Sequence, residues 1–538
     1  MRILFLICSF ISLAVSNLAI ADTANIKHEY RLVKKLNQKI AEIEAKNVWP
    51  NNKLATTPTF IYFDESEHTY ARAFKPTNPA WFLLPGFTPD TYFLDADNYQ
   101  FSTNHQHYGR SIDGQGPTFV FYPPYPKNEN MNVGEAILEH YSYITSNSYP
   151  FNQYIDREYS ALRSFPQYPL ARLELFLALQ ALTERLSNNQ TQDAAEEALK
   201  NYIAVNTVRL KEIDAESKEF ELHQQYKYGL WIYLFIKSFY ESIKDIPFID
   251  FDSINYEDLA DYDHIEDAIG TQQLGIPLIQ GLVTAALLDE VKPDWKTQFV
   301  SQNISPIDQL KALYPLTAEE AKERVQLLKD EYKIDQYINA NQDAFANYWQ
   351  TSDNYFTEFK EAKGVEVSLV TSPDAYTIMI EPLAENYHYL SVRGFIAKDL
   401  SETIEFADDT FLSFSSMPYL YTYYAQEEVI RNFKLAKTTA ILIDKKPYTL
   451  EELLKTPAVL NFTTLSIASE NVQLEINSAG SLLITAKGVT IKHLNATSSV
   501  CDFKYICAKQ PARKANFQAH KSLFDNFQKL LKVQKKRK

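Results

Sequence analysis

Apolar side chains recur along this chain with two different periods. Between residues 131 and 345 they return every three or four positions, with charged and amide side chains between them, which is typical of amphipathic helices. From Gly364 onward apolar and polar residues alternate, as in residues 365–369 and 472–476, which is typical of strands with one buried face. The change of period predicts a helical domain followed by a β domain.

The three- to four-residue period also predicts where the individual helices lie. They are expected at residues 133–144, 159–165, 170–186, 192–208, 218–243, 274–290 and 318–333. Thr317 before Ala-Glu-Glu, and Thr191 or Asp193 before Ala-Ala-Glu-Glu, are the residue types that cap helix N-termini. A leading helix is predicted at residues 22–46 and a short one, within the β domain, at 450–454.

These patterns predict an α+β multi-domain protein. A mixed N-terminal segment precedes a central all-α domain, and a mostly antiparallel β domain is followed by a terminal basic helix. The mixed segment is indicated by short aromatic runs between Leu54 and Phe121, separated by Pro, Gly, Asn and Asp. The predicted ranges are 1–21, 22–130, 131–345, 346–500 and 501–538.

The first 21 residues have the pattern of a secretory signal peptide. Arg2 supplies the positive start, residues 3–15 are almost entirely apolar, and Ala19-Ile20-Ala21 fits a cleavage site before Asp22. The apolar block is too short to span a bilayer. We expect a bacterial protein that is exported to the periplasm or secreted.

Charge is distributed unevenly along the chain. Residues 504–538 carry eleven Lys or Arg and one acid, so they contribute +10 to a total of −15 and leave −25 for the rest. The acidic body disfavours nucleic acid as a partner. The predicted basic amphipathic helix at 517–533 has two interpretations: it folds back on the acidic body, or residues 514–538 bind an anionic membrane surface.

Cys8 leaves with the signal peptide, so Cys501 and Cys507 remain. In an oxidising compartment this pair predicts a disulfide that closes a short loop. A metal site would need further ligands, and the nearest histidines, His493 and His520, lack zinc-finger spacing.

Complete catalytic motifs are missing from the sequence. Gly109-Arg-Ser111-Ile-Asp113 begins like a nucleophile elbow but lacks the second glycine that the tight turn needs. His105 and His107 share one face of an extended segment and are weak metal candidates, and their interpretation as exposed polar loop residues is the simpler one. We therefore predict no bound cofactor. If the protein were instead a metal-dependent hydrolase, the metal would be zinc.

The predicted helix that contains Glu135, Glu139 and His140 has the most suggestive polar pattern. Glu135 and Glu139 share one helix face at a spacing of four residues, and His140 follows directly. These three residues are the catalytic candidates of the sequence. A zinc hydrolase helix would carry a second histidine four residues after the first, and this chain has none there. A buried, hydrogen-bonded core histidine is the simpler interpretation of His140.

The order of several motifs resembles an exported metallopeptidase-like family of the HExxH (gluzincin-like) type. The motifs cover residues 118–300 and are Phe-Val-Phe-Tyr-Pro-Pro at 119–124, Ile-Leu-Glu-His-Tyr-Ser-Tyr at 137–143, Leu-Glu-Leu at 173–175, Tyr-Gly-Leu-Trp-Ile-Tyr at 228–233 and Leu-Leu-Asp-Glu-Val-Lys-Pro-Asp-Trp at 287–295. The resemblance implies a helical scaffold on which two His and one Glu bind zinc.

The chain departs from that family at each zinc position. Glu139 and Tyr143 stand where the two ligand histidines would be, His140 stands in place of the catalytic glutamate, and Tyr228 in place of the third ligand. Because zinc sites are built from His, Cys and carboxylates, the resemblance implies a degenerate site without chemistry.

The leading hypothesis is an exported, non-catalytic binding or interaction protein on such a scaffold, with a protein or peptide as partner. One alternative is a periplasmic or secreted hydrolase with an atypical site that includes Glu135, Glu139 and His140, with His105 and His107 as metal ligands. The other is a membrane-surface factor that acts through residues 514–538.

Overall fold

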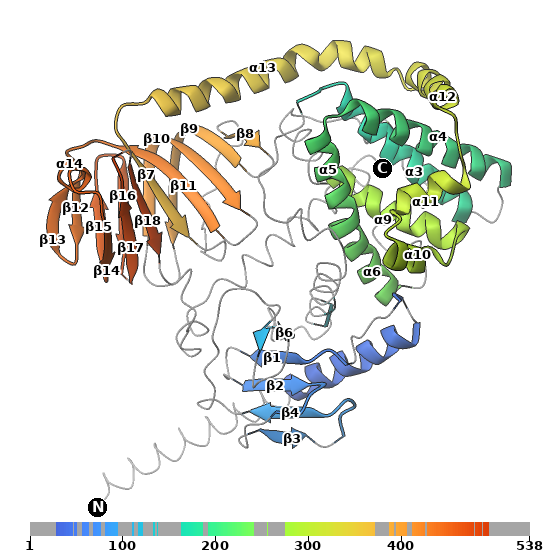
Figure 1. Cartoon of the computed structure of the whole chain (residues 1–538), viewed down its shortest axis with the longest axis horizontal. Coiled ribbons are helices and arrows are strands. Elements are labelled where there is room, and N and C mark those ends of the chain that lie inside the picture. Colours follow the sequence, from blue (N-terminus) through green and yellow to red (C-terminus); the bar gives the residue numbers. More distant parts are fainter. Residues whose placement is uncertain are drawn as a thin grey trace, which may run out of the picture. The chain divides into compact units, whose positions relative to one another are not determined.

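The computed structural model confirms an α+β multi-domain protein with a helical central region and a C-terminal β region (Figure 1). It describes residues 28–94, 163–240, 275–371 and 387–493, with short gaps in all but the third range, and a few residues between them. The chain divides into two compact units, one formed by residues 1–144 and 499–510, the other by 145–498 and 511–538. The predicted signal peptide and the tail from residue 501 onward lie outside the described residues.

The first unit contains a six-stranded sheet. Its strands, in spatial order, are β3 (Phe82–Leu84), β4 (Thr91–Leu94), β2 (His68–Arg72), β1 (Thr59–Phe63), β6 (Pro117–Phe121) and β5 (Arg110–Ser111). β1 and β6 are parallel, and the other neighbours are antiparallel. The predicted mixed segment is thus a mixed sheet.

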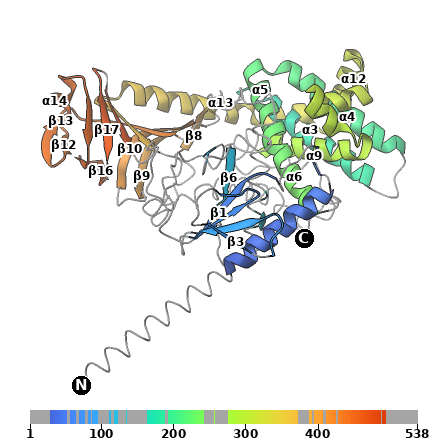
Figure 2. The same cartoon turned by 60° about the horizontal axis from the view of Figure 1, so that its bottom comes forward.

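The leading helix, residues 28–46, packs on this sheet with the apolar face that the sequence predicts (Figure 2). Its residue Asn37 donates to Thr91 Oγ1 at 3.1 Å and accepts from Arg72 Nε at 2.7 Å. Near its start, Glu29 Oε2 accepts from the Tyr70 hydroxyl at 2.9 Å. Burial lowers the pKa of Arg72 to about 10, so this guanidinium stays charged at neutral pH. Buried polar contacts therefore fix the helix on the sheet.

The helical region contains the helices predicted at 170–186, 192–208, 218–243, 274–290 and 318–333, together with three that were not predicted individually, at 295–302, 306–313 and 334–361. Its described elements are α3 (Gln167–Leu186), α4 (Gln192–Glu212), α5 (Ala215–His223), the π-helical segment η2 (Gln224–Gly229), α6 (Leu230–Phe239), α9 (Ile276–Val291), α10 (Trp295–Gln302), α11 (Pro306–Leu313), α12 (Ala318–Glu331) and α13 (Ile334–Glu361). The predicted cap Thr317 forms a capping box with Glu320. Among the described helices, none is long and apolar enough to cross a bilayer.

The β region begins directly after α13. Its sheet contains β13 (Lys446–Thr449), β12 (Ala440–Ile443), β15 (Leu465–Ala468), β16 (Val472–Ile476), β10 (Phe411–Tyr424), β11 (Glu428–Leu435), β7 (Val365–Thr371), β18 (Gly488–His493), β17 (Gly480–Ile484) and β14 (Val459–Phe462) in that order, and β9 (Gly394–Glu405) joins β10 to β8 (Tyr387–Ser391). Only β7 and β18 are parallel among these described pairs. The predicted helix at 450–454 is α14 (Leu450–Leu454).

α13 links the helical and β regions as one continuous helix, so it passes through residue 345, the predicted end of the helical domain. In its first half, the ring of Phe345 packs against those of Phe165 and Tyr168 of the helical region, at centroid distances of 4.8 and 5.0 Å. At its second half, Phe359 packs against Ile396 and Leu420 of the sheet. Both regions therefore share the apolar face of one helix.

A π turn divides the helix that the sequence predicts at 218–243. In η2 the Leu230 N–H reaches back five residues to the carbonyl of Gln225, which widens the helix at this point. The same carbonyl lies against Gly281 of α9, where an added Cβ would stand only 2.1 Å from it. Gly229 also has no room for a side chain, because its Cβ would lie 2.6 Å from the Leu278 carbonyl. The two helices can cross at this distance only with glycine on both.

The crossing predicts that Gly281→Ala destabilises the protein although alanine is the better helix former. Without the crossing, the substitution should stabilise the helix by about 0.5–1 kcal/mol. We expect instead a loss of at least about 2 kcal/mol in the free energy of unfolding, because the backbones must move apart. Urea denaturation of the two purified proteins measures the difference, and a more stable variant would contradict the close crossing.

Candidate functional site

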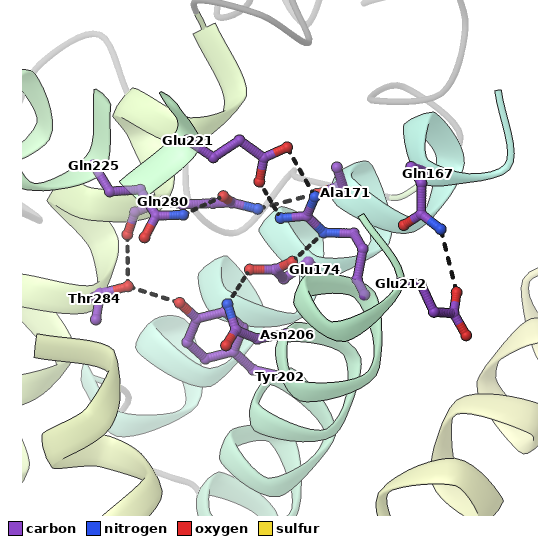
Figure 3. A network of polar contacts seen from close by, with 11 residues as sticks. Gln167, Ala171, Glu174, Tyr202, Asn206, Glu212, Glu221, Gln225, Gln280 and Thr284 are labelled. Carbon is purple, nitrogen blue, oxygen red and sulfur yellow. Dashed lines mark hydrogen bonds and ion pairs between the residues drawn. The ribbon is translucent and has the colours of Figure 1, made fainter. Parts of the chain in front are cut away.

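The helical region has a network of polar contacts at its centre (Figure 3), and the side chains that form this polar centre are buried. Its members are buried residues of α3, α4, α5, η2 and α9, namely Glu174, Tyr202, Asn206, Arg209, Glu221, Gln225, Gln280 and Thr284. Buried polar groups are costly unless they bond to one another, so the contacts within this polar centre decide its role.

An ionic triad lies at one side of the polar centre. Arg209 of α4 donates from Nε to Glu174 Oε2 at 2.6 Å. Its Nη1 and Nη2 atoms form a two-pronged pair with Glu221 of α5, at 2.9 and 2.6 Å. Asn206 donates to the second Glu174 oxygen at 2.8 Å. One guanidinium thus joins α3, α4 and α5 through charged hydrogen bonds, which are the strong ones.

The three residues of the triad stay ionised although they are buried, because opposite charges stabilise one another. Burial lowers the pKa of Arg209, but the two carboxylates outweigh burial and raise it above its ordinary value. The guanidinium therefore remains charged at every accessible pH. Two carboxylates facing one cation leave a formal charge of −1, which the amide of Asn206 offsets in part by donating to Glu174.

A chain of neutral hydrogen bonds continues from η2 through α9 to α3. Gln225 donates to the side-chain oxygen of Gln280 at 3.0 Å, and Gln280 donates to the Ala171 carbonyl at 3.3 Å. Thr284 gives its proton to the Gln280 carbonyl at 2.6 Å. The Tyr202 hydroxyl lies 2.7 Å from Thr284 Oγ1. Because the Thr284 proton is already donated to Gln280, Tyr202 must be the donor in this bond. Burial, followed by Glu174, raises the pKa of Tyr202, which keeps this donor protonated.

A second polar cluster surrounds Asp289 at the end of α9. Its carboxylate accepts from the Tyr233 hydroxyl at 2.6 Å and from Trp295 Nε1 at 3.0 Å. Lys237 and Lys296 lie 3.3 and 3.2 Å from it. Burial raises the pKa of Asp289, but Lys296, the two hydrogen bonds and Lys237 together lower it below its ordinary value. The ionised carboxylate joins α6, α9 and α10.

The resemblance assigns four positions to the zinc site, and Tyr228 is the one of them that lies among the described residues. It lies half-buried in η2, and its ring contacts His223 edge-on at a centroid distance of 5.9 Å. Trp231 lies at 6.0 Å, and the ammonium of Lys227 lies 5.2 Å from the Tyr228 ring centroid. The neighbours of this phenol are therefore aromatic rings and a cation. In the part of the chain that the structure describes, no group of three His, Cys, Asp or Glu could hold a metal ion.

The sequence-predicted site residues lie outside the described residues. This holds for the catalytic candidates Glu135, Glu139 and His140, for His105 and His107, and for the cysteines of the predicted disulfide, Cys501 and Cys507. The polar centre was not predicted from the sequence, although a signal exists in α4. Tyr202, Asn206 and Arg209 follow one another at four- and three-residue steps and so share the helix face that an apolar stripe would occupy.

The triad predicts that Arg209→Met is strongly destabilising, because it leaves two buried carboxylates without their cation. We expect the free energy of unfolding to fall by about 3–5 kcal/mol. Arg324→Met is the matched control, since Arg324 binds Glu197 and Asn201 on the protein surface. A surface pair contributes about 1 kcal/mol or less. Equal losses in the two variants, measured by urea denaturation, would contradict a structural role for the triad.

The Asp289 cluster predicts a stability difference that depends on pH. At pH 7 Asp289→Asn should cost about 1–3 kcal/mol, because the charged hydrogen bonds are lost. The folded-state pKa is lowered, so the carboxylate stabilises the fold above the unfolded-state pKa of about 3.9. As the pH falls below about 4 this contribution disappears, and the variant and the wild type should converge. Asp343→Asn, at an exposed position of α13, should have little effect at any pH.

Comparison with known proteins gives no family for this chain. No family model matches it, and neither a curated protein nor a solved structure matches it. Its own residues therefore carry the functional argument. Within the described helical region, they form a buried polar centre, an Asp289 cluster that joins three helices, and a tyrosine in aromatic surroundings at position 228.

Proposed function

We propose that the protein is an exported, non-catalytic binding or interaction protein built on a degenerate metallopeptidase-like scaffold. Export is supported by the signal-peptide pattern of residues 1–21. The absence of catalysis is supported by the residues that stand at the positions of zinc ligands in the resembling family. The partner that we propose is a protein or peptide.

The observation that carries the proposal is the environment of Tyr228. On the resemblance, this position supplies the third zinc ligand, which is a carboxylate. Here it is a phenol between His223 and Trp231, with the Lys227 ammonium beside its ring. A phenol is not among the usual zinc ligands, and a nearby ammonium repels a divalent cation. Both features act against a zinc site at this point of the helix.

The acidic residues of the helical region support the same conclusion. Glu174 and Glu221 share Arg209, and Asp289 is occupied by a tyrosine, a tryptophan and two lysines. A general base must have a lone pair that a substrate or water can reach. Side chains that are buried and already bonded to cations contribute to the scaffold instead. The carboxylates described at the helical centre are therefore structural.

The metal content of the mature protein tests the proposal. We expect no stoichiometric zinc after incubation with zinc and dialysis, and no peptidase activity. A restored variant combines Glu139→His, His140→Glu, Tyr143→His and Tyr228→Glu, which supplies the ligand set of the resembling family. It should retain one zinc per chain. The matched control carries the same changes except Tyr228→Glu and should bind zinc more weakly because it lacks the third ligand.

Two outcomes would count against separate parts of the proposal. Stoichiometric zinc in the wild-type protein would contradict the non-catalytic assignment and would favour the alternative hydrolase with His140, His105 and His107 as ligand candidates. A restored variant that binds zinc no better than its control would contradict the metallopeptidase-like scaffold, because the four positions would then not converge.

A further inference from the structure

We draw no further inference here: the strongest candidate, the exposed apolar pair Phe82 and Leu83 on the edge strand β3 of the sheet in the first unit, carries none because nothing in the described part of the chain shows what covers it.

Discussion

Arg209 lies between two carboxylates, Glu174 and Glu221, at a position that water does not reach. Three buried charges can remain together only if each carboxylate is bonded to the cation, because an isolated charge at this depth would cost several kcal/mol. This requirement fixes how α3, α4 and α5 meet. A rotation of any of the three helices would separate a charged pair, so the triad selects one arrangement among many that would bury similar apolar area.

The other features of the helical region follow from that arrangement. With α5 held by Glu221, the chain enters η2, where the π turn places the Gln225 carbonyl against Gly281 of α9. The Gln225 side chain then bonds to Gln280, which connects α9 to α3. Polar groups at the helical centre are thus used in holding helices together. This use of the carboxylates supports the proposal of binding rather than catalysis, which rests first on the environment of Tyr228.

Periodicity was a reliable guide to the elements, and a poor one to the polar centre. The apolar spacing predicted α3, α4, α9 and α12, and residue chemistry predicted the Thr317 cap, because both are local properties. The π turn depends on a contact between η2 and α9, which no local pattern contains. The acids nearest to Arg209 in sequence, Glu212 and Asp214, are not the ones that it binds, so its pairing with Glu174 could be known only from the fold. The candidate residues around Glu139 lie outside the described chain, and their role remains a prediction.

Hydrogen exchange followed by mass spectrometry tests most directly whether the buried triad holds these helices together as one unit. If it does, amides in α3, α4, α5 and α9 share the slowest exchange class of the wild-type protein and lose protection together when Arg209 is replaced by methionine. The strands of the β region, which has its own core, should keep more of their protection. Retained protection in these helices without Arg209 would contradict the account, and so would a loss confined to α4.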